Sequence, residues 1–170
     1  MMTKLPRTAL LLAAVALCAC DAPTSSTALE VTLTASPDPA VAVASHGVTY
    51  QVTNPDDTIS TLEYPWRTSF AVTIQETGGL AVDITSVNLK VQQASGGIVI
   101  TPSGGDTEYY RFNSSASGNR VAANGTASVG FEVWYDLPNG GKEALVTVSF
   151  GFRDDDGYTY TDSAQVRVAP

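Results

Sequence analysis

Aspartates near the C-terminus form the densest group of side chains that could bind a metal. Asp154, Asp155 and Asp156 precede Gly157, and Asp162 follows in the next apolar run. Carboxylate oxygens are the ligands that Ca²⁺ prefers, which makes Asp154, Asp156 and Asp162 candidate calcium ligands. However, the spacing is not that of an EF-hand loop, and Asp-Gly is also a common hairpin signal. Because one loop supplies few ligands, we favour a plain turn and expect no bound metal.

Trp134 is the main candidate for ligand binding. It lies between Glu132 and Asp136, and its parity is opposite to that of the apolar residues of the same run. We therefore expect the indole on the outer face of a strand, beside two carboxylates. There it could stack on a sugar or anchor a protein partner, with Tyr109 and Tyr110 as possible neighbours.

The alternative for Trp134 is a covered indole. Large aromatic side chains are seldom left bare in a monomer, so we favour cover by the loop 113–124 or by Tyr109 and Tyr110. The other tryptophan, Trp66, shares the parity of the apolar residues and is expected to be buried.

His46 is the only histidine and lies in a Ser-His-Gly turn. A catalytic triad would need a nucleophile and an orienting acid that the sequence does not place beside it. A zinc site with one histidine and no thiolate would also be unusual. We therefore expect a solvated loop residue, no catalytic residues and no cofactor. A secreted hydrolase remains the competing class of protein.

The N-terminal segment has the features of a targeting signal. Lys4 and Arg7 are basic, and residues 8–17 form an apolar run that is too short to span a bilayer. The run ends in Leu17-Cys18-Ala19-Cys20, which resembles the lipobox of bacterial lipoproteins. This resemblance implies cleavage after residue 19, acyl chains on Cys20 and anchoring to a membrane of the bacterial cell envelope. An ordinary cleaved signal peptide is the alternative.

The leader divides the chain into three parts: a signal peptide at 1–19, a lipidated polar tether at 20–28 and a folded domain at 29–170. The tether would reach at most about 30 Å, and the domain would be periplasmic or extracellular. Without the leader, 7 of the 9 basic residues and all 17 acidic residues remain, a balance of −10. This balance argues against nucleic acid as a partner, whereas an envelope protein or a glycan stays open.

Two long alternating runs dominate the folded part. In residues 66–76, Phe70, Val72 and Ile74 share one parity, which predicts a strand with one buried face. A second run follows at 80–93, and Gly78-Gly79 between them could provide positive φ angles. We therefore predict a long hairpin covered by a second sheet.

The second run contains a change of parity. Its first apolar residues are even-numbered, whereas Val87, Leu89 and Val91 are odd-numbered. A regular strand would turn one of these sets toward water. We therefore predict a β-bulge or a change of sheet near Thr85-Ser86.

The remaining chain reads as short strands separated by Gly, Pro, Asn and Asp, with a polar and irregular segment predicted at 113–124. No sustained helical period follows the leader. This pattern predicts an all-β fold, a single antiparallel immunoglobulin-like sandwich of about 7–9 strands.

The stretch from Trp66 to Val87, followed by Ala123-Asn-Gly-Thr126, Trp134-Tyr135 and Asp154-Asp-Asp-Gly157, resembles the immunoglobulin-like modules of bacterial cell-surface proteins. The resemblance covers about 29–170 and lacks the Cys…Trp…Cys core of antibody domains. It implies a non-enzymatic binding or structural module of the cell envelope. Glycan or protein recognition through Trp134 is the second hypothesis.

Overall fold

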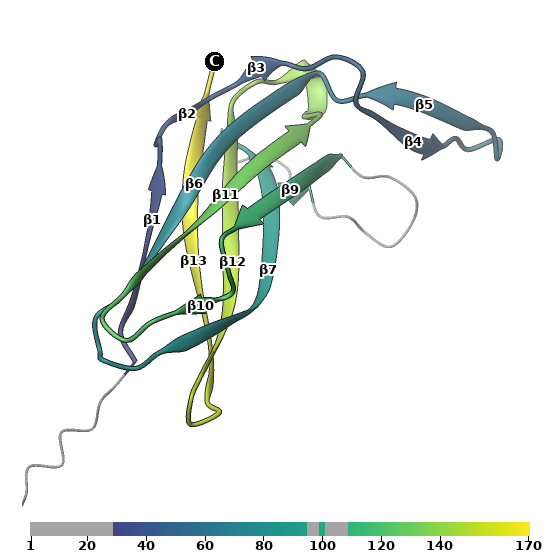
Figure 1. Ribbon diagram of the computed structural model, residues 1–170. Coiled ribbons are helices and arrows are strands. Elements are labelled where there is room, and N and C mark those ends of the chain that lie inside the picture. The colour runs from purple at the N-terminus through teal and green to yellow at the C-terminus, as the bar shows by residue number, and fades with distance from the viewer. Residues whose placement is uncertain (1–28, 95–98, 101–108) are drawn as a thin grey trace, which may run out of the picture.

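The computed structural model describes residues 29–94, 99–100 and 109–170, which form an all-β fold of two facing sheets (Figure 1). The strands pair antiparallel, apart from a short parallel contact between β13 and β2. The predicted all-β sandwich class is therefore confirmed. No helix in these residues is long and apolar enough to cross a bilayer.

Sheet A has the order β1-β6-β11-β9, with β3 beside the start of β6. Its strands are β1 (Val31–Ser36), β3 (Val43–Ala44), β6 (Trp66–Glu76), β9 (Tyr110–Ala116) and β11 (Thr126–Tyr135). Sheet B has the order β10-β7-β12-β13-β2, with β8 beside β7. Its strands are β2 (Ala40–Val41), β7 (Val82–Gln93), β8 (Val99–Ile100), β10 (Arg120–Val121), β12 (Ala144–Asp154) and β13 (Thr159–Ala169).

A third, separate sheet is the hairpin of β4 (Thr49–Thr53) and β5 (Ile59–Glu63). Figure 1 shows it extending from the sandwich at the end where the C-terminus lies. Residues 59–63 were not expected to form a strand. The segment 113–124 was expected to be irregular, but it contains the end of β9 and all of β10.

Alternating apolar side chains close the sandwich. One face of each long strand is buried, as in β6, where Phe70, Val72 and Ile74 point inward. Phe131 lies at the centre, with its ring centroid 5.3 Å from that of Phe70 and 6.2 Å from that of Phe150 in sheet B. Burial of these side chains is the main stabilising contribution.

The prediction of a hairpin between residues 66–76 and 80–93 is wrong. β6 pairs with β1 on one edge and β11 on the other, so neither edge is left for β7. β7 instead pairs with β12 and β10 in sheet B. The connection between β6 and β7 therefore crosses from one sheet to the other, and Gly79 has a φ of 84° within it.

The predicted bulge in the second run is confirmed. Ser86 pairs with Gly151 and Ile84 pairs with Phe152, so Thr85 is the extra residue in β7. The bulge brings Val82 and Val91, which differ in parity, to the same buried face.

Candidate functional site

Trp134 lies on the outer face of sheet A, as its parity predicts, but it is not open to solvent. In β11 it pairs with Arg67 of β6 and Arg111 of β9, and it is only 9% exposed. Its cover is the base of the β4–β5 hairpin, where Tyr50 and Tyr64 form a buried cluster with the indole. Cover was the favoured alternative, but neither 113–124 nor Tyr109 and Tyr110 provides this cluster.

The hairpin is held on Trp134 by specific contacts. The rings of Tyr50 and Tyr64 stack with centroids 4.6 Å apart, and the Tyr50 hydroxyl donates to Asp136 Oδ2 at 2.7 Å. Burial, together with the hydrogen bond to Asp136 and its charge, raises the pKa of Tyr50 above its ordinary value. The hydrogen bond from this hydroxyl fixes the hairpin to the residue that follows β11.

Tyr109 and Tyr110 do not form one surface with Trp134. Tyr110 packs against the core side of sheet A, and its hydroxyl donates to the backbone oxygen of Leu89. Tyr109 is exposed, and its carbonyl accepts from the Asp136 N–H at 2.8 Å. The three residues proposed as a ligand site therefore point to different environments.

Trp66 faces the core side of β6, as expected, but it is only partly buried. The ammonium of Lys142 lies over its ring, 4.6 Å from the centroid. The cation therefore makes a cation–π contact with the indole.

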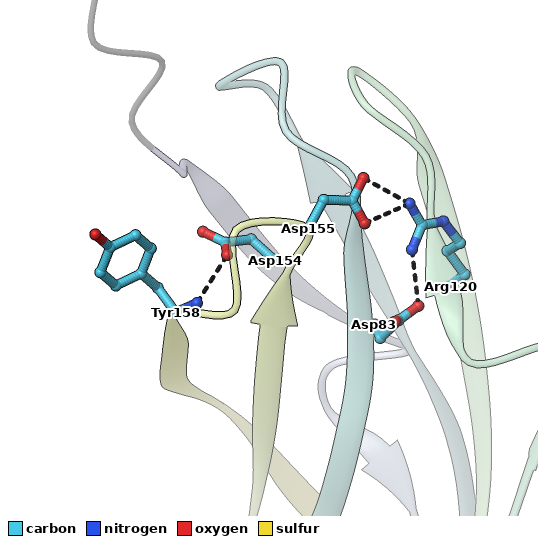
Figure 2. A network of polar contacts seen from close by, with 5 residues as sticks. All are labelled: Asp83, Arg120, Asp154, Asp155 and Tyr158. Carbon is cyan, nitrogen blue, oxygen red and sulfur yellow. Dashed lines mark hydrogen bonds and ion pairs between the residues drawn. The ribbon is translucent and has the colours of Figure 1, made fainter.

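The aspartates around Gly157 organise the turn between β12 and β13 (Figure 2). Asp154 is buried, and its Oδ1 accepts from the Tyr158 N–H at 2.9 Å while Oδ2 accepts from the Tyr160 hydroxyl. The hydrogen bond from Tyr160 holds the pKa of Asp154 below its ordinary value and raises that of Tyr160 to about 12. Asp154 thus acts as an acceptor that closes the turn.

Asp155 makes an ion pair that ties this turn to the neighbouring strands. Arg120 of β10 contacts both oxygens of Asp155, at 2.7 and 2.8 Å, and Asp83 of β7 at 3.1 Å (Figure 2). Asp156 is exposed, and Asp162 accepts from the Ser163 N–H. Over the described ranges, no three His, Cys, Asp or Glu residues are grouped as a metal site, so Asp154, Asp156 and Asp162 are not brought together.

Glu76 is the buried carboxylate that sequence reasoning missed. It ends β6 on the core face, is 1% exposed, and accepts from the N–H groups of Gly79 at 3.1 Å and Asn124 at 2.8 Å. Burial raises the pKa of Glu76, but backbone N–H groups of Asn124, Leu80, Gly79 and Gly78 outweigh it and hold the pKa below its ordinary value. The signal was its even parity, which it shares with Phe70, Val72 and Ile74.

A shallow depression lies on the outer face of sheet A, with Gly130 and Ser115 in its lining, beside the ion pair of Glu132 with Arg67 at 2.9 Å. A Cβ at Gly130 would lie 3.0 Å from Ser115 Oγ, so glycine leaves room for the Ser115 hydroxyl. His46 is exposed in the loop between β3 and β4, apart from this depression. Cys20, the signal peptide and the tether lie outside the described residues.

No family model and no curated protein matches the chain. Among solved structures, a structural-genomics target designated SoR45 is 13% identical, with 84% of this chain and 86% of that one covered and a TM-score of 0.45. A protein described as ApaA from Bordetella pertussis is 12% identical, with 84% and 93% covered and a TM-score of 0.44. The secreted serine protease VesC from Vibrio cholerae is 13% identical, with 61% of this chain and 20% of that one covered and a TM-score of 0.40. These likenesses are remote.

Proposed function

We propose that this protein is a non-enzymatic lipoprotein of the bacterial cell envelope, whose immunoglobulin-like sandwich serves as a binding or structural module. The observation that carries the proposal is the order of features at the N-terminus: basic residues, a short apolar run, Leu17-Cys18-Ala19-Cys20 and a short polar tether before the first strand. Acyl chains on Cys20 would hold the domain at a membrane.

The contacts of three carboxylates, two of them buried, support a structural role. Glu76 accepts hydrogen bonds from the connection between β6 and β7, and Asp154 accepts them from the turn between β12 and β13. Asp155 is paired with Arg120. These carboxylates therefore stabilise turns and connections of the fold, which is the role expected of them in a structural module.

The positions of the chain ends support an orientation in which the long axis of the domain points away from the membrane. In Figure 1 the described chain enters at the end of the sandwich that carries the β6–β7 connection and the β12–β13 turn. The β4–β5 hairpin and the C-terminus lie at the opposite end. A tether on Cys20 would therefore place the hairpin away from the membrane.

Lipid attachment is tested with full-length wild type, Cys20→Ser and Cys18→Ser expressed in a bacterium that can be labelled with radioactive palmitate. Wild type and Cys18→Ser should be labelled and should sediment with membranes, because both keep the acceptor at residue 20. Cys20→Ser should be unlabelled and keep its leader. Unlabelled wild type in the soluble fraction, cleaved as an ordinary secreted protein, would refute the anchor.

A further inference from the structure

The β4–β5 hairpin has open strand edges. Within the described residues its two strands pair only with each other, in the register from Thr49–Glu63 to Thr53–Ile59. On β5, Ile59 is 66% exposed and Leu62 is 44% exposed. A two-stranded sheet with exposed apolar side chains is a template to which another extended segment can add.

The hydrogen bonds at the two ends of the hairpin identify the groups that point outward. The Tyr64 N–H donates to Val48 at 2.9 Å and the Asn54 N–H donates to Thr58 at 2.8 Å. Hydrogen-bonded pairs alternate with non-bonded pairs in an antiparallel ladder. Because the pairs 48–64 and 54–58 are bonded, the pairs 50–62 and 52–60 between them are bonded as well. The N–H and C=O groups of Ile59, Thr61 and Glu63 therefore face the open edge.

The charge of the hairpin restricts what can occupy this edge. Asp56, Asp57 and Glu63 are acidic, and no lysine or arginine occurs between 47 and 65. The Thr58 N–H and hydroxyl donate to Asp56 Oδ1 at 3.2 and 2.6 Å and favour its negatively charged form. A second copy would bring like charges together, whereas a basic segment would be attracted.

Neighbouring side chains on β5 point to opposite faces, so Leu62 lies on one face, whereas Glu63 and, at the other end of the strand, Ile59 lie on the other. We propose that the open edge of β5 binds an extended protein segment with alternating apolar and basic residues, which adds a third strand to the hairpin. Its apolar side chains would lie beside Leu62 and its basic side chains beside Glu63. The inference rests on the proposed function for the orientation of this edge away from the membrane.

The test uses the full-length protein in detergent and a short synthetic peptide of alternating valine and lysine. Two control peptides are a valine–glutamate alternation and a valine–lysine peptide with its residues in two blocks. Isothermal titration should show binding of the alternating basic peptide alone. Hydrogen exchange should show new protection at Ile59, Thr61 and Glu63. Equal binding of all three peptides, or no protection on β5, would overturn the proposal.

Three variants locate the binding edge. Thr61→Pro removes an outward N–H and leaves the bonded pairs of the hairpin in place, so it should weaken binding about tenfold or more relative to Thr61→Ala. Gln51→Pro makes the same change on the other edge and should bind as wild type does. Loss of binding in Gln51→Pro but not in Thr61→Pro would overturn the assignment to β5. Unchanged near-ultraviolet circular dichroism shows that each variant keeps the tyrosine–tryptophan cluster.

Two further measurements separate this inference from its alternatives. A dimer in sedimentation that Thr61→Pro dissociates would mean that a second copy occupies the edge, and it would overturn the basic partner. Mass spectrometry of the same preparations reports acylation at Cys20. Peptide binding without acylation would refute the anchor alone, and acylation without binding would refute the edge alone.

Discussion

Glu76 shows how one residue can determine the connection between two sheets. Its carboxylate lies at the end of β6 and faces backbone N–H groups of the β6–β7 connection and of Asn124 before β11. Removal of the carboxylate would take the acceptor away from these N–H groups. The residue therefore links the end of β6 and the adjacent β6–β7 connection to the segment before β11, which is distant in the sequence.

We predict that Glu76→Gln lowers the free energy of unfolding by about 2 kcal/mol at pH 7, because a neutral amide replaces the negative charge that several backbone N–H groups stabilise and adds an NH₂ group beside those donors. The lowered pKa of Glu76 also gives its contribution a pH dependence. This contribution is present above the ordinary carboxyl pKa and is lost as the pH falls through the lower pKa of the folded state. Urea denaturation of both proteins from neutral to acidic pH measures the difference.

The difference between wild type and Glu76→Gln should become smaller toward acidic pH. Gln75→Glu, in the same strand but on its exposed face, is the matched control and should leave stability nearly unchanged. A difference that is constant with pH would mean that the charge of Glu76 is not stabilising.

Tyr50 offers a second test at the residue scale. We predict that Tyr50→Phe loses the hydrogen bond to Asp136 and weakens the attachment of the hairpin by about 1 kcal/mol. Amide exchange should then rise in β4 and β5 but not in β6 or β12. Tyr109→Phe, at an exposed ring, should not change exchange in β4 and β5. Faster exchange throughout the sandwich in Tyr50→Phe would contradict a local role.

At the scale of elements, the bulge in β7 depends on the strand beside it. Thr85 and Ser86 crowd Gly151 of β12, and a Cβ there would lie 2.5 Å from Ser86 Oγ and 3.0 Å from Thr85 Oγ1. Glycine at residue 151 therefore allows the extra residue of β7 to lie against β12.

We predict that Gly151→Ala destabilises the fold by about 1 kcal/mol, because these side chains must move. Adding Ser86→Ala removes the nearest atom and should recover part of the loss, as a double-mutant cycle in chemical denaturation would measure. Ser149→Ala, on β12 away from the bulge, is the control. Additive effects of Gly151→Ala and Ser86→Ala would show that the crowding is not the cause.

At the scale of the whole molecule, the two ends of the sandwich differ in what they present. One end carries the first described residues and the acidic β12–β13 turn, and the other carries the hairpin and the C-terminus (Figure 1). Under the proposed anchor at Cys20, the mature chain has no other cysteine. A single introduced thiol can therefore report distance from the membrane.

We predict that a fluorophore on Asp156→Cys is quenched more strongly by a lipid-embedded quencher than one on Asp56→Cys, in full-length acylated protein on vesicles. Asp156 lies in the β12–β13 turn and Asp56 at the tip of the hairpin. A longer tether inserted at 21–28 should reduce the difference, because the domain could then sample more orientations. Equal quenching at both positions with the native tether would contradict the orientation.

The amino-acid sequence determined the properties that depend on neighbours along the chain. The alternation in 66–76 predicted the buried face of β6, and the change of parity between Ile84 and Val87 predicted the bulge. The parity of Trp134 predicted its outer face. These predictions succeeded because successive side chains of a strand point to opposite faces wherever that strand lies.

Only the tertiary structure decided which strands pair and what covers them. The Gly78-Gly79 turn is compatible with a hairpin, yet β1 and β11 occupy both edges of β6 and send β7 to the other sheet. The cover of Trp134 comes from Tyr50 and Tyr64, and the donors around Glu76 come partly from Asn124. Strand partners and buried polar contacts join residues that are far apart in the chain. Which partners are chosen depends on the difference in free energy between alternative folds, and a local sequence pattern does not contain that difference.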